Sequence, residues 1–331
     1  MPITTKEIAK ICKVSRGTVD RALNNRPGIN EKTRELILKA VEMYNYRPHH
    51  IASSLSRGKS MSIGVIIFDL KNRYFSQMSN TISLTAKSQG YFTYIAVTEK
   101  EINSEKHILQ NMASRRVDGL IMLPVNQGKD FINNLKNLEI PVVTIGNHLP
   151  GIHHVSIDDF KAAHDSARFI SEAGYKKICF ICPPLRKKGS QNGLYNINSQ
   201  FERARGFENY MKTNPKIQYE VLIEKKFCDV AASMVRKSKE KIAFFCSSDI
   251  YALELLKNFR TMGISVPAEA GLMGFDNLDI LAYITPQIAT VSTSIDEVGK
   301  RAMEKLFALI AGETTERITH VPYQICPGET L

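Results

Sequence analysis

The sequence predicts an α/β protein in which a small N-terminal helical head precedes a larger body of parallel sheets. Helix start signals and helical apolar spacing fill residues 4–44, whereas from Ser62 onward short apolar runs alternate with helical patterns. Such alternation is typical of parallel sheets covered by helices. The chain has 331 residues, 43% of them hydrophobic, which is long enough for two or three compact units with their own cores.

Positive charge is concentrated at the N-terminus. The net charge is +11; residues 1–60 hold 12 lysines and arginines against 5 acidic residues, and the other residues hold 32 against 28. This distribution is typical of a polyanion-binding head, although a solvated lysine-rich surface would give the same count. The apolar runs are shorter than the roughly 20 residues of a membrane span, and the N-terminus lacks the apolar core of a secretory signal. We therefore expect a cytoplasmic protein.

Two short helices are predicted in the first 24 residues. Thr4 and Glu7 form a capping box that starts the first helix, and Ser15 is placed to cap the second. The turn between them is tight, and a small core closes around the apolar residues Ile8, Ala9, Val14, Val19 and Leu23. This pattern predicts a helix-turn-helix, in which the second helix presents its N-terminal residues to base edges in the DNA major groove.

The outward positions of the second helix carry DNA-binding chemistry. Arg16 has the donor fork that matches the two acceptors of a guanine edge. Asp20, one helical turn later, could hold that guanidinium, and an exposed intrahelical ion pair without a reading role is the alternative interpretation. Gly17 shares this face, and three further side chains suit phosphate contacts: Thr18, Arg21 and Asn24.

A third helix and a short marginal helix follow. Asn30 caps the third helix. Its buried side is expected to contain Ile37, Ala40, Val41 and Tyr44. Pro48 suits the first turn of a further helix over "IASSL", from which Leu55 protrudes. A helix this short is marginal alone, so we expect it to form only when something docks against it.

Eight apolar runs in the body predict strands. They cover residues 62–68, 91–97, 118–124, 140–146, 176–182, 220–224, 241–246 and 270–275, with helical patterns at Phe75–Gln89 and Glu105–Arg115 among the intervening segments. Eight strands are too many for one such sheet, so two similar halves with a cleft between them are expected. Ligands bind at the carboxyl ends of the strands in sheets of this kind.

Residues 3–59 resemble the DNA-binding head of the lactose-repressor (LacI/GalR) family. "EIAK" and "VSRGTVDRALN" are similar to that family's "DVA" and "VS…TVSRVLN" stretches, and "HHIASSL" is similar to its hinge helix. The resemblance implies that Leu55 wedges into the minor groove of the DNA. It implies DNA-contacting positions at Thr5, Ser15, Arg16, Gly17, Thr18, Arg21, Asn24, Ile51 and Leu55.

The head departs from the family's pattern at two positions. The family usually has glycine where Lys13 stands, and a left-handed backbone there would cost a lysine about 1 kcal/mol, so we expect a locally altered turn. The usual serine is Asp20, which removes one phosphate contact.

The resemblance extends over the body. "DLKNRYF" (69–75) is similar to the family's D-x-x-N-P-F-F loop with Arg73 replacing proline, and "ERARGF" (202–207) to its R-x-x-G-F helix start. Residues 246–277 and 284–306 match two further family segments. The implied fold is a two-lobed, periplasmic-binding-protein-like body of parallel sheets over residues 61–331. Its lobes comprise roughly 61–160 plus 291–322 and 161–290 plus 323–331.

The resemblance places effector-binding residues in the cleft. These are Tyr74, Phe75, Arg203, Ser248 and Asp276. Carboxylate, guanidinium and hydroxyl groups suit a ligand rich in hydroxyls, and the two aromatic rings suit an apolar ring face. The alternatives are a core aromatic, a surface arginine, and a helix cap at Asp276. Gly146 stands where some relatives have a ligand-binding aspartate, with Asn147 beside it, which leaves the ligand's identity open.

No convincing catalytic, cofactor or metal constellation appears. Gly58-Lys59-Ser60 resembles the end of a phosphate-binding loop, but Ser53 stands where the first glycine is required. His153 and His154 lack a third ligand and are interpreted as solvated loop histidines. The pair Cys179 and Cys182 falls in a predicted buried strand, so both are expected to be core cysteines facing opposite sides.

We therefore expect a non-enzymatic, sequence-specific DNA-binding regulator, most simply a repressor. It would bind a near-palindromic double-stranded operator as a homodimer and respond to a small sugar-like effector, without membrane contact, cofactor or metal. Release of DNA and tighter binding of DNA are both compatible with the sequence as effector responses. The alternative is a sugar-binding protein of a transport or sensing system, which would share the body but have no use for residues 1–60.

Overall fold

The computed structural model describes residues 3–46, 58–182, 198–224 and 226–331. The chain divides into two compact units, Met1–Ser60 and Met61–Leu331, which we call the head and the body. Residues 47–57, with the expected hinge helix and its candidate DNA contacts Ile51 and Leu55, lie outside the described residues.

The described residues of the head form three of the predicted helices: α1 (Thr5–Ile11), α2 (Arg16–Leu23) and α3 (Glu31–Met43). The capping box is present, because the Thr4 hydroxyl accepts from the Glu7 amide at 3.3 Å and the Glu7 carboxylate accepts from the Thr4 amide at 2.7 Å. The Ser15 hydroxyl accepts from the Thr18 amide at 3.1 Å and thereby starts α2. The caps fix where both helices of the helix-turn-helix begin.

The core of the head differs from the prediction at Tyr44. Ile8, Val19 and Ile37 are fully buried, but Tyr44 is 47% exposed and Tyr46 is buried instead. Tyr44 is already the C-terminal cap of α3, and a positive φ of 45° at the next residue turns the chain back towards the core. The Tyr46 hydroxyl then lies 2.5 Å from the Thr5 hydroxyl.

The turn between α1 and α2 keeps a left-handed residue. Lys13 has a φ of 55°, so the expectation of an altered turn was wrong. The Val14 amide donates to the Ala9 carbonyl at 2.9 Å, which closes the turn around the lysine. The lysine therefore occupies a conformation that favours glycine, at a cost of about 1 kcal/mol.

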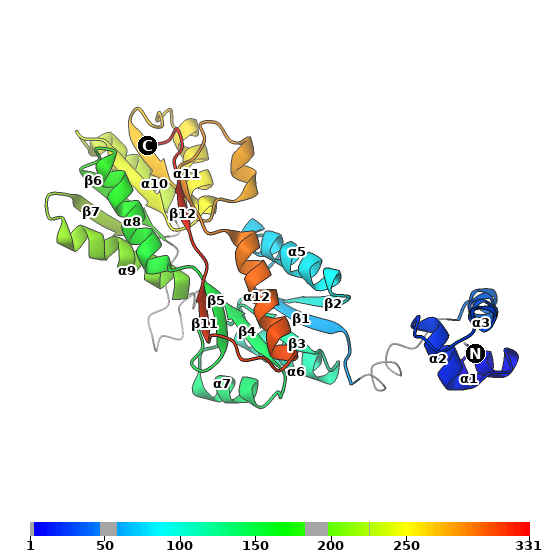
Figure 1. The fold of residues 1–331 in the computed structure, drawn as a ribbon. Coiled ribbons are helices and arrows are strands. Elements are labelled where there is room, and N and C mark those ends of the chain that lie inside the picture. Colours follow the sequence, from blue (N-terminus) through cyan, green and yellow to red (C-terminus); the bar gives the residue numbers. More distant parts are fainter. Residues whose placement is uncertain (1–2, 47–57, 183–197, 225) are drawn as a thin grey trace. The chain divides into compact units, whose positions relative to one another are not determined.

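The first lobe of the body contains a parallel six-stranded sheet in the order β11-β5-β4-β3-β1-β2. The strands are β1 (Ser62–Ile67), β2 (Phe92–Val97), β3 (Gly119–Met122), β4 (Val142–Ile145), β5 (His153–Ser156) and β11 (Ile318–His320). Its helices are α5 (Arg73–Ser88), α6 (Ile102–Ser114), α7 (Lys129–Lys136) and α12 (Ile295–Ile310). Figure 1 shows α5 and α12 side by side against this sheet.

The second lobe contains a parallel four-stranded sheet in the order β7-β6-β8-β9. The strands are β6 (Lys177–Ile181), β7 (Gln218–Leu222), β8 (Ile242–Cys246) and β9 (Ala270–Met273). Its helices are α8 (Asp159–Glu172), α9 (Asn198–Thr213), α10 (Phe227–Lys237), α11 (Asp249–Thr261) and the short η1 (Asp279–Tyr283). An antiparallel pair, β10 (Thr290–Ser292) with β12 (Gln324–Cys326), completes the body.

Close helix packing and buried strands hold the second lobe together. Gly206 on α9 lies against the backbone of Phe160 on α8, where an added Cβ would come within 2.0 Å of the Phe160 carbonyl oxygen. Cys179 and Cys182 are both buried and belong to two different apolar clusters, as expected for residues on opposite sides of a strand. Within the described residues, no helix combines the length and apolar character needed to cross a membrane.

Candidate functional site

The outward face of α2 and its N-cap form an exposed polar surface on the head. Ser15, Arg16, Gly17 and Arg21 are exposed, and Thr18 is half-buried behind them. Among the described residues, Arg16 and Arg21 make no ion pair and no side-chain hydrogen bond, so their guanidinium groups are available to a ligand. Arg16 at the start of the second helix of a helix-turn-helix suits contact with DNA bases, and Arg21 in the last turn of that helix suits contact with phosphates.

Asp20 does not hold Arg16, which corrects the pairing considered from the sequence. Its carboxylate lies 3.3 Å from Arg26 and accepts from the Asn24 side-chain amide at 2.9 Å. Both partners lie towards the C-terminal end of α2, because Asn24 is the cap of that helix. Asn24, a predicted phosphate contact, is thus engaged within the head, whereas Arg16 is left for an external partner.

The five predicted effector residues come together around one cavity in the body. Tyr74, Phe75, Arg203, Ser248 and Asp276 all line a cavity of about 160 Å³. Tyr74 and Phe75 belong to the first turn of α5, which Asn72 caps by accepting from the Tyr74 amide at 3.0 Å. The other three come from α9, the start of α11 and the segment after β9. The cavity therefore lies between the two lobes at the carboxyl ends of strands, the usual ligand position in such sheets.

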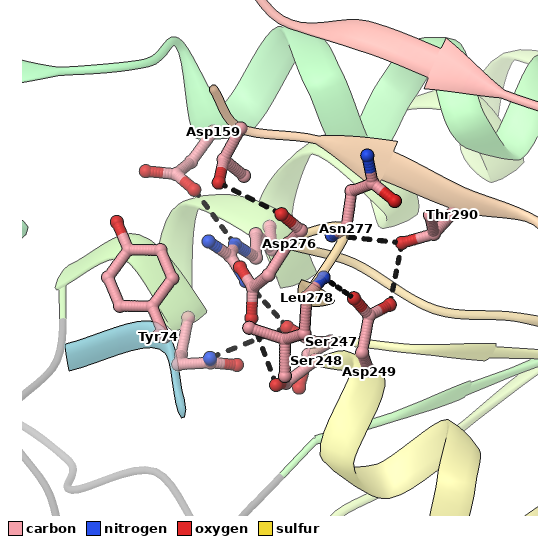
Figure 2. A network of polar contacts seen from close by, with 12 residues as sticks. Tyr74, Asp159, Ser247, Ser248, Asp249, Asp276, Asn277, Leu278 and Thr290 are labelled. Atoms are coloured by element: carbon pink, nitrogen blue, oxygen red, sulfur yellow. Dashed lines mark hydrogen bonds and ion pairs between the residues drawn. The ribbon is translucent and has the colours of Figure 1, made fainter. Parts of the chain in front are cut away.

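A buried ionic network forms the wall that belongs to the second lobe (Figure 2). Arg203 donates to Asp159 at 2.8 Å and to Asp276 at 3.1 Å, and it also donates to the Ser247 carbonyl at 2.6 Å. The guanidinium carbon lies 3.7 Å from the centre of the Phe275 ring. The side chains of Arg203, Asp159 and Asp276 are only 6%, 10% and 7% exposed. The network fixes the planar donors of Arg203 and the free lone pairs of both carboxylates.

Burial dominates the electrostatics of this wall. It raises the pKa of Asp276 to about 6, against the opposing effect of Arg203 and of the Ser248 hydroxyl, which donates to Asp276 at 3.0 Å. The pKa of Asp159 is also raised by burial, and Arg203 opposes that change. The pKa of the Tyr74 hydroxyl, which points towards Asp159 in Figure 2, is raised by burial and by Asp276. Tyr74 is therefore a neutral hydrogen-bonding group at any physiological pH.

Several residues that contribute to the cavity were missed from the sequence. Asp159 was invisible as a partner of Arg203 because 44 residues separate them and only the packing of α8 on α9 joins them. Gln200 also lines the cavity, and its side-chain oxygen has no hydrogen-bond partner among the residues that the structure describes, although the residue is 91% buried. Its position one helical turn before Arg203 was a usable signal, because residues i and i+3 share a face.

A second buried carboxylate supports the wall from behind. Asp249 accepts from the Thr290 hydroxyl at 2.6 Å and from the Leu278 amide at 2.8 Å. Burial raises its pKa to about 7, with Asp276 adding to the increase. Asp276 itself has a φ of 116° and is not a helix cap, which removes that alternative. The contacts of Asp249 hold the segment that carries Asp276 in this conformation.

The loop after β4 closes the cavity on its other side. Gly146 and Asn147 both line the cavity, and Gly146 has a φ of 75°. The Asn147 side chain donates to the Pro124 carbonyl at 2.6 Å and accepts from the backbone amide of Asn198 in the second lobe. The asparagine is therefore used to join loops, while the glycine beside it leaves room for a ligand.

The predicted position of the histidines was wrong. His153 and His154 lie on β5, and His154 is 4% exposed with its Nδ1 atom 2.9 Å from the Thr144 hydroxyl. Burial lowers its pKa to about 3, so it is neutral. The two central residues of this short strand, His154 and Val155, are both buried within the sheet, which the sequence did not reveal. The described part of the chain contains no group of three or more His, Cys, Asp or Glu placed to hold a metal ion.

Comparison with known families matches both units. The pattern described as "Bacterial regulatory proteins, lacI family" matches residues 4–49, and the pattern described as "Periplasmic binding protein-like domain" matches residues 167–331. A curated relative is the HTH-type transcriptional repressor PurR of Aliivibrio salmonicida (strain LFI1238). It is 28% identical over 321 residues, which cover 95% of this chain and 94% of the relative.

Two solved structures are similar in fold. The lac repressor dimer bound to operator and the anti-inducer ONPF aligns with a TM-score of 0.86 at 20% identity, covering 100% of this chain and 99% of that one. A periplasmic binding protein/LacI transcriptional regulator from Alkaliphilus metalliredigens QYMF, complexed with D-xylulofuranose, aligns with a TM-score of 0.70 at 23% identity. This alignment covers 82% of this chain and 98% of the Alkaliphilus chain.

Proposed function

Because this chain belongs to the lacI family of bacterial regulatory proteins, we propose that it represses transcription from an operator under the control of a small hydroxyl-rich effector. It is a DNA-binding transcriptional regulator that works as a homodimer. The observation that carries the proposal is the pair of exposed arginines on α2, Arg16 and Arg21, which form no ion pair within the described part of the chain, in a helix-turn-helix head joined to a body with a polar cavity.

Arg16 and the start of α2 read the operator. Arg16 binds a guanine edge and Arg21 binds a phosphate, with further contacts from the other DNA-binding positions expected from the sequence: Thr5, Ser15, Gly17, Thr18, Asn24, Ile51 and Leu55. Gly17 adds no side chain to this surface, and an added Cβ would meet only the Ser15 hydroxyl at 3.7 Å. Base reading at this point of α2 therefore depends on Arg16.

The cavity between the lobes binds the effector. Tyr74, Phe75, Arg203, Ser248 and Asp276 contact a neutral sugar or sugar derivative, for which the buried carboxylates supply acceptors and Arg203 supplies donors. One guanidinium against two carboxyl groups leaves this wall without excess positive charge, which suits a hydroxyl-rich ligand better than an anion, because a phosphate would meet Asp159 and Asp276. The D-xylulofuranose complex of the Alkaliphilus regulator supports this class.

An apolar edge of the first lobe supports the dimer. β2 is an edge strand with exposed or half-buried side chains throughout, and Phe92 and Ile95 on it are 64% and 42% exposed. Leu84 on the adjacent α5 is 58% exposed. An uncovered apolar edge strand is an aggregation hazard, which pairing with a second copy removes. We assign this surface to the dimer interface.

The two units have separate roles. Residues 1–60 bind DNA and residues 61–331 bind effector and partner, with the lobes divided roughly as 61–160 plus 291–322 and 161–290 plus 323–331. The protein acts in the cytoplasm, where its operator is, and has a binding rather than a catalytic role. A transport or sensing protein without a DNA role has no support, because the PurR relative aligns over the head as well as the body.

Operator selection tests the DNA-binding role. The purified protein is used to select sites from random double-stranded DNA, and the selected site is expected to be near-palindromic. Arg16→Ala should lose about 1–3 kcal/mol of binding free energy on this site and relax base preference at one position per half-site. Lys39→Ala, which removes an equal charge from the exposed face of α3, serves as the control. Equal losses for Arg16→Ala on operator and random DNA contradict base reading.

A thermal-shift screen tests the effector role. Sugars, polyols, their phosphates and nucleobases are tested against the full chain, because a ligand at 100 times its dissociation constant adds about 2.7 kcal/mol of stability. A neutral sugar or polyol should raise the melting temperature of the wild type and not that of Asp276→Asn. A hit that both proteins bind equally removes Asp276 from the effector site.

A further inference from the structure

One ion pair crosses directly between the two lobes beside the cavity. Arg73, the first residue of α5, binds Asp279, the first residue of η1, through two parallel contacts, the Nε contact being 2.7 Å. These residues lie 206 positions apart in the sequence. Each side chain is about half exposed, at 51% and 46%, so the pair lies at the surface of the body. Among the described residues, neither forms another ion pair.

Arg73 and Asp279 lie next to residues of opposite cavity walls. Arg73 directly precedes Tyr74, and Asp279 follows Asp276 by three residues. Tyr74 belongs to the first lobe and Asp276 to the second, and both line the cavity. A guanidinium bound by two contacts to a carboxylate is geometrically stricter than a single contact. The Arg73–Asp279 pair therefore joins these two walls at the surface of the body.

A second contact joins the lobes at the loop after β4. There the Asn198 amide at the start of α9 donates to the Asn147 side chain of the first lobe. Asn147 lines the same cavity as Tyr74 and Asp276. Rotation of one lobe against the other would thus strain both contacts together, whereas local fraying of α5 would leave the Asn147 contact intact.

The sequence departs from its family at this position. Arg73 stands where the related loop pattern has proline, which offers neither charge nor hydrogen-bond donor. Since both groups of the ion pair are exposed, their attraction is screened by salt, with a Debye length of about 8 Å at physiological ionic strength.

We propose that Arg73 and Asp279 are positioning residues whose ion pair holds the two lobes together over the cavity and makes effector exchange dependent on ionic strength. We call this ion pair the clasp. The role of this ion pair in regulation rests on the proposed effector role of the cavity. The clasp can be tested without effector or DNA, so a negative result in that test would leave the regulator role standing. Conversely, a negative result in operator selection or in the effector screen would leave the clasp standing.

Hydrogen exchange of the full chain tests the clasp. Arg73→Asp should raise exchange of the remote Asn198 amide about two- to fivefold, the range expected for loss of an exposed pair. Arg73→Ala should give a smaller rise. The charge-swapped variant, Arg73→Asp with Asp279→Arg, should return exchange towards the wild-type rate. Raising NaCl from 0.05 to 1 M should speed exchange in the wild type and have little effect in Arg73→Ala.

A matched control separates the clasp from a general effect of charge. Arg301 pairs with Glu297 at 2.7 Å with similar exposure, 52% and 37%, but both residues lie on α12. Arg301→Asp should leave the Asn198 amide unchanged. The clasp is contradicted if Arg73→Asp speeds exchange only around residues 72–76, or if the charge swap fails to restore Asn198. It is equally contradicted if Arg301→Asp has the same effect as Arg73→Asp.

Discussion

Replacing Arg203 by methionine probes the buried network that forms the cavity wall. Methionine keeps most of the aliphatic stem that packs on Phe275 but removes the guanidinium between Asp159 and Asp276. Two carboxylates that are about nine-tenths buried then lose their shared cation. Breaking a buried pair in this way costs about 3–5 kcal/mol, because an uncompensated charge stays buried.

The cost should depend on pH, because the carboxylates can take up protons instead. The pKa of Asp276 is already raised to about 6 with Arg203 present, and without Arg203 it rises further. Arg203→Met should therefore be least harmful near pH 5 and approach its full cost near pH 8. Each unit of additional pKa shift corresponds to about 1.4 kcal/mol.

Urea unfolding followed by circular dichroism at pH 5 and pH 8 measures this difference. In thermal unfolding at pH 8, the melting temperature should be lower by roughly 6–20 °C, from about 2–4 °C per kcal/mol for a unit of this size. Arg205→Met is the control, because Arg205 lies on the same helix with a 66% exposed side chain paired to Glu202. A loss below about 1 kcal/mol at pH 8, or equal losses at both pH values, would refute the reasoning.

Three further predictions concern other parts of the chain. Glu105 is fully buried and accepts hydrogen bonds from the Val125 and Asn126 amides. Burial raises its pKa from 4.5 to about 7, so between these pH values the folded state holds a proton that the unfolded state releases. Wild-type stability should therefore fall as pH rises from 4.5 to 7, and urea titrations of Glu105→Gln should show a shallower slope, because the raised pKa values of Asp249 and Asp276 still contribute; an unchanged slope contradicts the assignment. Lys13→Gly should stabilise the head by about 1 kcal/mol, seen as slower exchange of the Val14 amide, and faster exchange would count against strain at Lys13. Phe92→Glu should give a monomer in sedimentation velocity while Ile318→Glu, on the opposite edge strand β11, stays dimeric; dimers in both would move the interface elsewhere.

The sequence predicted the elements whose signals are local. Capping by Thr4, Ser15 and Asn30 fixed the three head helices, and all eight long apolar runs became strands. The strands that were not predicted, β5, β10, β11 and β12, have three or four residues each, too few to show a period. Their existence depends on neighbours that are distant in the chain.

The cavity could be predicted only in part, for a related reason. Tyr74, Phe75, Arg203, Ser248 and Asp276 were identified from a resemblance, and the structure gathers them in one place. Their partners were not identified, because Asp159 meets Arg203 only through packing of α8 on α9, and Arg73 meets Asp279 only because the two lobes face each other. For Asp20, the partner suggested by the sequence was wrong. Helical spacing favoured Arg16, but the ion pair of Asp20 is with Arg26, beyond the end of α2.

The most direct test of the account couples the two sites. Affinity for the selected operator is measured by fluorescence anisotropy at fixed salt, with and without a saturating hit from the thermal-shift screen, for the wild type and for Asp276→Asn. The account predicts that the hit changes operator affinity of the wild type by about 5- to 150-fold, in either direction, and leaves Asp276→Asn unchanged. Equal operator affinity with and without ligand in the wild type would contradict an effector-controlled regulator.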